Sequence, residues 1–130
     1  AIDVSKTKIR ISNVVIDSVT DKGVSIGENS TAMIENITIS NALVGLVAKD
    51  SSVVTVNMLR LSDISMADTM AYRKKPHFKG SKILALNVVG GLNKSIAQRG
   101  SSISLNGSDI KPVKVNIGDL YGSTMRSIKK

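Results

Sequence analysis

A sequence pattern that recurs every 22 residues constrains this chain more than any other feature. Each copy opens on a small residue, continues with alternating apolar and polar side chains, and ends in a polar turn. The copies occupy residues 1–7, 23–29 and 45–51. A second pattern recurs in step with the first at intervals of 23 and 22 residues, beginning at Ile11, Ile34 and Val56. A fixed period of this length predicts a solenoid, in which stacked repeats bury a core that one repeat cannot bury alone.

The repeat is expected to consist of β-strands rather than helices. Its segments are short, alternate with a period of two, are rich in Val, Ile and Thr, and are separated by turn-forming residues. A leucine-rich repeat has a similar period, but its Leu/Asn consensus is missing from this chain. Two or three short strands per repeat instead predict the coils of a parallel β-helix, whose strands pair with the coils above and below, roughly 4.8 Å away.

The pattern extends into a fourth coil that contains an insertion. Residues 68–72 take the place of residues 45–49, and residues 81–87 resume the pattern of residues 52–57. The segment between them, residues 73–80, is an expanded turn.

Alignment of the copies predicts which side chains stack inside the solenoid. The two inward columns are Ile2, Val24, Leu46 and Thr69, and Val4, Ile26, Ala48 and Ala71. Asn13 and Asn36 are expected to form an asparagine ladder that Met58 interrupts. In this register Ile26 faces inward and Ser25 faces outward, so an aspartate is expected to be destabilising at position 26 and nearly neutral at position 25.

From residue 1 to about residue 89 the chain resembles single-stranded right-handed parallel β-helix proteins. This pectin-lyase-like group includes pectate lyases and many bacterial surface and phage tail proteins, and the likeness is clearest at residues 21–30, 49–52 and 71–76. The resemblance implies an all-β, right-handed parallel β-helix of about four coils of about 22 residues. It implies no single activity, because lyases, hydrolases, epimerases and inert spacers share this scaffold. If the chain is part of a bacterial or phage surface protein, as the resemblance implies, its expected location is extracellular or at the cell surface. A cytoplasmic location is left open.

Composition limits the classes of function. The net charge is +8 and the isoelectric point is near 9.9, with the excess in the expanded turn and in residues 126–130. A basic surface favours polyanionic partners such as acidic polysaccharide, nucleic acid or anionic lipid. A solvated surface without such a partner is the favoured alternative, because runs of charge are usually solvated faces. Two tyrosines and one phenylalanine leave little material for the aromatic platforms that bind neutral sugars or single-stranded nucleic acid. No apolar run is long enough to span a membrane, and the absence of cysteine excludes disulfides and thiolate metal sites.

The start of the pattern predicts an open solenoid edge. Ala1 aligns with Gly23, so the first coil begins inside a repeat and has no cap. Unpaired strand edges and apolar side chains at such an end need a cover. The expected partners are therefore further β-helix coils or another protein chain at the N-terminal end.

The other end of the chain is expected to be capped by a hairpin. The coils are predicted to stop near Val89, with β-helix coils over residues 1–89 and a capping hairpin and basic tail over residues 90–130. The two expected hairpin strands are residues 101–105 and 113–117, and Asn106 begins the turn between them, in an Asn-Gly pair that is typical of hairpins.

Glu28 and Asp50 are the weak catalytic candidates. They occupy equivalent positions in successive coils, so their carboxylates are expected to stack on the outside, roughly 5 Å apart. Adjacent carboxylates can act as acid and base or bind Ca²⁺. The favoured interpretation is a surface ion ladder, in which Lys6 and Arg73 flank the pair and Lys49 neutralises it.

The expanded turn is the leading candidate for a binding element, because turns on a rigid scaffold vary freely. An insertion without function is the alternative. The only histidine, His77, has no sequence neighbour that would orient it for catalysis or complete a metal site. The candidate binding residues are Tyr72, Arg73, Lys74, Lys75, His77 and Lys79.

These observations predict a structural and binding β-helix segment of a larger bacterial or phage surface protein, which contacts a protein partner or an acidic polymer. Part of a polysaccharide-active lyase or hydrolase is the alternative, and it rests on the fold resemblance alone. This chain alone is not expected to be an enzyme, and no cofactor or metal site is predicted. Nucleic-acid binding rests on net charge alone and ranks last.

Overall fold

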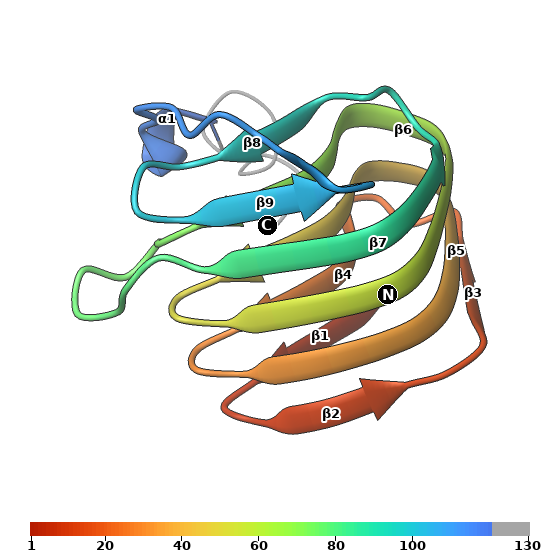
Figure 1. The fold of residues 1–130 in the computed structure, drawn as a ribbon, viewed down its shortest axis with the longest axis horizontal. Helices are drawn as coiled ribbons and strands as arrows, with labels where there is room; N and C mark the ends of the chain where they lie inside the picture. The colour runs from red at the N-terminus through yellow and green to blue at the C-terminus, as the bar shows by residue number, and fades with distance from the viewer. Residues whose placement is uncertain (121–130) are drawn as a thin grey trace.

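A computed structural model describes residues 1–120 as an all-β parallel solenoid of about five coils (Figure 1). The fold class is therefore confirmed, with β-strands stacked coil upon coil. The elements are β1 (Ile2–Ser5), β2 (Lys8–Ile11), β3 (Val14–Asp17), β4 (Lys22–Gly27), β5 (Thr31–Lys49), β6 (Val53–Tyr72), β7 (Lys82–Gly90), β8 (Ser95–Ala97), β9 (Ser102–Leu105), β10 (Ser108–Asp109) and α1 (Ile117–Leu120). The basic tail, residues 126–130, lies outside the described residues.

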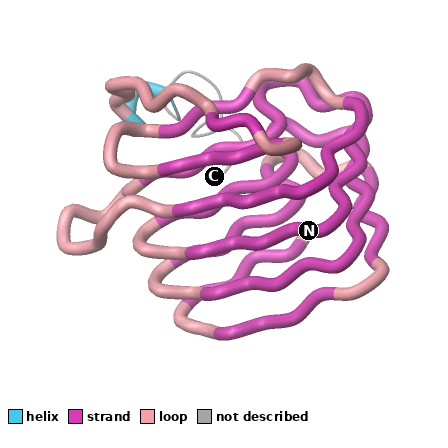
Figure 2. Tube along the Cα trace, viewed as in Figure 1, coloured by secondary structure: helices cyan, strands magenta, loops and turns pink. Residues whose placement is uncertain are grey.

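The strands form three parallel faces. The first face consists of β1, β4, the ends of β5 and β6, and β8. The second consists of β2, the starts of β5 and β6, β7 and β9. The third consists of β3, the middles of β5 and β6, and the end of β7. β5 and β6 are long because each continues through all three faces before the chain reaches a turn (Figure 2).

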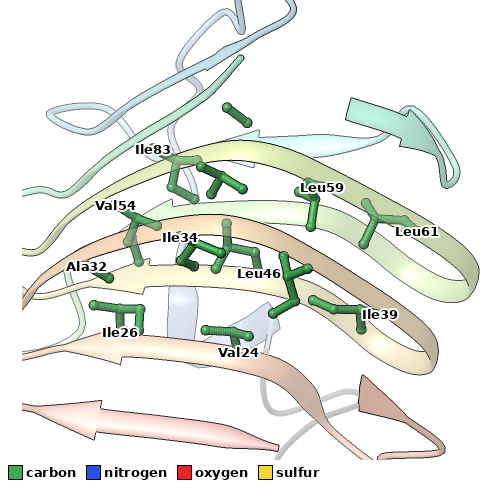
Figure 3. Packing of buried hydrophobic residues seen from close by; sticks show 14 of the residues in the cluster. Val24, Ile26, Ala32, Ile34, Ile39, Leu46, Val54, Leu59, Leu61 and Ile83 are labelled. Atoms are coloured by element: carbon green, nitrogen blue, oxygen red, sulfur yellow. The ribbon is translucent and has the colours of Figure 1, made fainter. Parts of the chain in front are cut away.

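The strand register matches the register predicted from the repeat. Ile26 pairs with Val4 on one side and with Ala48 on the other. Val24 pairs in the same way with Ile2 and Leu46. The side chains of Ile26 and Val24 are fully buried in the main apolar core between the faces (Figure 3). The core is therefore a set of stacked aliphatic columns, as the alternation of apolar and polar residues requires.

The small residues that open the repeats lie at a crowded corner. A Cβ atom on Gly45 would lie 2.6 Å from the Asp68 carbonyl oxygen and 2.8 Å from a methyl group of Leu61. A Cβ atom on Gly23, one coil earlier, would lie 2.6 Å from a methyl group of Ile39 and 2.9 Å from the carbonyl oxygen of Gly45. The corner between the third and first faces therefore excludes larger side chains in these two coils.

The asparagine ladder is also present. The Asn36 side-chain amide donates a hydrogen bond to Asn13 Oδ1, at 3.2 Å. Met58 follows Asn36 in register and interrupts the ladder, as predicted. Met58 has no side-chain donor for Asn36 Oδ1. The Arg60 guanidinium donates to this oxygen instead, at 2.8 Å, so it has a hydrogen-bond partner.

A buried serine ladder, which the sequence interpretation missed, joins the coils at the turn before the second face. The backbone N–H groups of Ser30, Ser52 and Ser81 each donate to the side-chain oxygen of the serine one coil further on, at 2.9–3.2 Å. The members are Ser30, Ser52, Ser81 and Ser101, and all four are buried. The ladder pairs buried backbone N–H groups that the turns would otherwise leave without acceptors.

Parallel stacking continues past Val89, where the coils were expected to stop. β8 pairs with the end of β6 and β9 pairs with β7, so both belong to a further coil. The last coil escaped the sequence interpretation because its strands, β8 with three residues and β9 with four, are too short to display the repeat.

The capping hairpin is shorter than predicted. β9 pairs with β10 around Asn106 and Gly107, whose φ angles of 53° and 80° suit a two-residue hairpin turn. The predicted second strand at residues 113–117 is wrong, because Val113 instead forms a parallel bridge with Gln98 and Ile117 begins α1. Pro112 has no N–H to donate to the hairpin, so antiparallel pairing ends before it.

A second apolar cluster lies on the outside of the first face. Val47, Met70 and Tyr72 pack there with Val115 and Ile117. These two residues belong to the C-terminal segment, residues 111–120, which follows the hairpin. This segment leaves the hairpin because its apolar side chains gain burial against the exterior of the solenoid.

Ser25 belongs to the same outer surface and is only 4% exposed. It stands in the outward column between Asp3 and Val47. The expectation that an aspartate would be nearly neutral at this position is therefore not supported, because outward on this face does not mean exposed.

Candidate anion-binding cleft

The expanded turn at residues 73–80 projects beyond the other turns of the solenoid (Figure 1, the green loop between β6 and β7). A buried carboxyl group holds its first half. Oδ1 of Asp50 accepts hydrogen bonds from the backbone N–H groups of Lys74 and Lys75, at 2.7 and 2.9 Å. Because two adjacent amides converge on one oxygen, the backbone direction at the start of the turn is set by the preceding coil.

The second half of the turn is held by Ser51. The Lys79 N–H donates to Ser51 Oγ at 2.7 Å, and the Ser51 N–H donates to the Lys79 carbonyl at 2.9 Å. Within the turn, the Phe78 N–H donates to the Lys75 carbonyl at 3.1 Å. The insertion is therefore an ordered structure anchored at both ends.

The predicted outer stack of Glu28 and Asp50 does not form as expected. Asp50 is only 1% exposed, because the expanded turn folds over it and uses its carboxyl group as an anchor. Glu28 instead forms an ion pair with Lys75, with a distance of 2.7 Å between Nζ and Oε2. The two carboxyl groups have separate structural partners, and an exposed acid–base pair at this position is not supported.

The Lys75–Glu28 ion pair joins the turn to the second coil. Hydrogen bonds from Lys75 and from Ser5 Oγ lower the pKa of Glu28 to about 2. The hydrogen bond to Glu28 in turn raises the pKa of Lys75. At neutral pH both partners are charged, and this lysine is committed to the scaffold rather than directed to a ligand.

This contact predicts a pH dependence. The pKa of Glu28 falls from 4.5 to about 2 on folding, so the stability it contributes is complete above about pH 4.5 and is lost as the pH falls towards 2. Glu28→Gln should therefore lower the melting temperature at pH 7 and have a much smaller effect near pH 2, where about half of the Glu28 carboxyl groups are protonated in the folded protein. Thermal unfolding of both proteins across this range measures the difference. A difference that stays constant with pH would contradict the ion pair.

Tyr72 is not available for binding. It is only 1% exposed and belongs to the second apolar cluster, so its place among the candidate binding residues is wrong. The tyrosine alternates with the inward Ala71 and therefore points outwards, but the C-terminal segment packs against that side of β6.

His77 is exposed at the tip of the turn, where its ring lies against Phe78 with 4.3 Å between the ring centroids. Within residues 1–120, no three His, Cys, Asp or Glu side chains gather as a metal site would require. His77 therefore extends a small ring surface at the tip of the turn.

The cations at the base of the turn line a basic cleft. Its two adjoining lobes have volumes of about 290 and 380 Å³. The cationic lining residues are Arg73 and Lys74 from the turn, Arg99 from the next coil, and Lys114 from the C-terminal segment. No carboxylate is among the lining residues, so the charged groups that an entering anion meets in the lining are all positive.

Gln98 connects the walls of the cleft. Its Oε1 accepts from the Arg73 N–H at 2.8 Å, and its Nε2 donates to the Val115 carbonyl at 3.1 Å. The backbone continues this bridge, because the Arg99 N–H donates to the Val113 carbonyl at 2.9 Å. Three segments that are distant in sequence are thus held in one arrangement.

The structure therefore divides the predicted binding residues. Arg73 and Lys74 line the cleft, whereas Lys75 is paired with Glu28 and Lys79 is exposed outside the lining. Arg99 and Lys114 were missed. The alignment of Ser95–Ala97 with Thr69–Ala71 would have revealed Arg99, because it places Arg99 one coil beyond Arg73. No comparable signal exists for Lys114, which reaches the cleft through tertiary packing.

Comparison of the chain with protein-family models, curated proteins and solved structures finds no significant match. Within residues 1–120, no helix is long and apolar enough to cross a membrane. The choice of function consequently depends on the chemistry of the cleft.

Proposed function

We propose that this chain is a binding segment, in which a rigid β-solenoid presents the basic cleft to an acidic polymer. The observation that carries the proposal is the convergence of Arg73, Lys74, Arg99 and Lys114 on one cleft without a lining carboxylate. Guanidinium and ammonium groups in such an arrangement bind carboxylate or sulfate groups through charge-assisted hydrogen bonds.

An acidic polysaccharide fits this cleft better than a neutral sugar or a nucleic acid. No aromatic residue is among the lining residues, so neither sugar rings nor bases have a surface on which to stack. The side-chain amide nitrogen of Asn116 offers hydrogen bonds to sugar hydroxyl groups. The polymer would therefore be recognised through its charge and its hydroxyl groups.

A polysaccharide-active enzyme is not favoured by any single observation. Asp50 serves the fold and Glu28 is paired, so neither is positioned as a general acid or base. The location at a bacterial or phage surface, the right-handed coil and the pectin-lyase-like assignment stay predictions.

A contact at the N-terminal edge also stays a prediction. β1, β2 and β3 each pair with a neighbour on one side only among the described residues. On the other side, their backbone N–H and C=O groups are placed to pair with strands of another coil or of another protein chain.

The proposal is tested with two variants of equal net charge. In the cleft variant, four cations are replaced by serine, namely Arg73, Lys74, Arg99 and Lys114. In the control variant, four exposed lysines outside the cleft lining are replaced, namely Lys8, Lys79, Lys94 and Lys111. Binding to polygalacturonate or heparin is then measured by calorimetry over a salt series.

The cleft variant should lose most of its affinity and show a shallower salt dependence, because fewer counterions are released when fewer cations contact the polymer. The control variant should remain close to the unmodified protein. Equal losses in both variants would mean that only net charge matters and would overturn the cleft as the binding site. A single-stranded oligonucleotide that binds as tightly as the polysaccharides would overturn the choice of polymer.

A further inference from the structure

Three cations of the cleft occupy one column that runs along the solenoid axis. The parallel pairing of β6 with β8 places Arg99 one coil beyond Arg73. The parallel bridge between Gln98 and Val113 continues this register and places Lys114 one coil beyond Arg99. Because neighbouring strands lie about 4.8 Å apart, this cation column crosses two coil spacings, or roughly 10 Å of stacked backbone.

The side chains of the cation column are open to a ligand. All three are exposed and line the smaller lobe of the cleft. Within residues 1–120, the side chains of Arg99 and Lys114 form no hydrogen bond or ion pair, and Arg73 donates to the Pro76 carbonyl at 3.4 Å. A guanidinium group has five N–H donors, so Arg73 keeps others for an anion.

The charge of the column changes sign at the expanded turn. In the two preceding coils the equivalent positions are the carboxyl residues Glu28 and Asp50. Beyond the turn the column contains only cations, and like charges at opposite positions of neighbouring strands repel each other. The lobe has no lining carboxylate to offset this repulsion, so an anionic ligand that follows the column would do so.

We infer that the cation column holds an extended acidic chain parallel to the solenoid axis, with the expanded turn at one end of the bound stretch. A chain in this direction contacts all three cations, whereas a chain that crosses the coils along the strands comes close to one of them. The register fixes the direction and the order of these contacts, and the long side chains adjust to the separation of the acidic groups. This inference rests on the proposed function and adds the direction of the ligand to it.

The first test measures binding of polygalacturonate by calorimetry over a salt series. Arg73→Gln, Arg99→Gln and Lys114→Gln should each make the dependence of log affinity on log salt concentration shallower, by about one released counterion. The matched controls are Lys79→Gln, on the same turn as Arg73, and Lys111→Gln, on the same segment as Lys114. Neither control residue lines the cleft, so both variants should keep the slope of the unmodified protein.

The outcomes separate the inference from the proposed function. A shallower slope in only one of the three column variants would mean that the chain crosses the column, which overturns the inference and leaves the proposed function standing. The same change in all five variants, or in none of them, would overturn both.

The second test observes the direction of the ligand in the unmodified protein, so it does not depend on how the variants fold. Tetragalacturonate that carries a nitroxide at its reducing end is added, and the broadening of amide signals is measured by NMR. Broadening should be strongest at one end of the column, either in the expanded turn or at residues 116–118, and weak in β7 and β9. The strongest broadening in β7 and β9 would show that the chain extends along the strands over the second face, and would overturn the inference.

Discussion

Ile26→Asp is expected to destabilise the protein by at least about 4 kcal/mol, which is enough to unfold a domain of marginal stability. The side chain is 0% exposed and is stacked between Val4 and Ala48 in the main core. The substitution removes a buried aliphatic group and places a carboxyl group where the neighbouring side chains are aliphatic. Urea unfolding monitored by circular dichroism measures the loss.

The matched control is Met33→Asp. Met33 lies between the inward Ala32 and Ile34 but is 50% exposed, so an aspartate there remains in water. Its effect should stay within about 0.5 kcal/mol, as for most surface substitutions. Similar losses for both variants would mean that the strands do not alternate between core and solvent as the register requires. Ser25 is unsuitable as the control, because it is buried on the outer side of the first face.

Asp50→Ala is expected to lower the free energy of unfolding by about 2–4 kcal/mol, because two backbone N–H groups lose their acceptor at about 1–2 kcal/mol each. The effect should be largest in the expanded turn, where Lys74 and Lys75 depend on this oxygen. Hydrogen exchange measured by NMR should show faster exchange of these two amides than in the unmodified protein. Weaker binding of acidic polymer should accompany the change, since Lys74 lines the cleft.

Asp50→Asn separates the hydrogen-bond role from other effects. An asparagine retains an acceptor at the position of Oδ1 and should preserve most of the stability and most of the exchange protection. Unchanged exchange at Lys74 and Lys75 in the alanine variant would disprove the anchoring role of Asp50. A loss in the asparagine variant as large as in the alanine variant would show that accepting hydrogen bonds is not what the residue contributes.

The two predictions differ in how far the sequence supports them. The burial of Ile26 follows from the alternation of its strand and from the repeat, because each coil must place its aliphatic residues against those of the next. The burial of Asp50 does not follow from alternation. It requires the expanded turn to fold back over the carboxyl group. The repeat does not predict the backbone path of this turn, because the inserted residues have no counterpart in the other coils.

The same distinction applies to the cleft. Arg73 and Lys74 were recognised because they lie in an insertion, and insertions are visible against a regular period. Tyr72 was misassigned because its outward direction was correct but the segment that covers it lies more than 40 residues away in the chain. Lys114 was missed for the same reason, since the C-terminal segment crosses to the first face through the packing of Val115 and Ile117.

The sequence by itself determined the parallel solenoid, its strand register, its aliphatic columns and the position of the inserted turn. These features depend on contacts between equivalent residues of adjacent coils, which a repeat displays directly. The tertiary structure decided which turn cations face the cleft, which carboxyl groups serve the fold, and which outward surface is covered. Those features depend on the C-terminal segment and the inserted turn, where no repeated neighbour specifies the packing and only the folded arrangement brings the residues together.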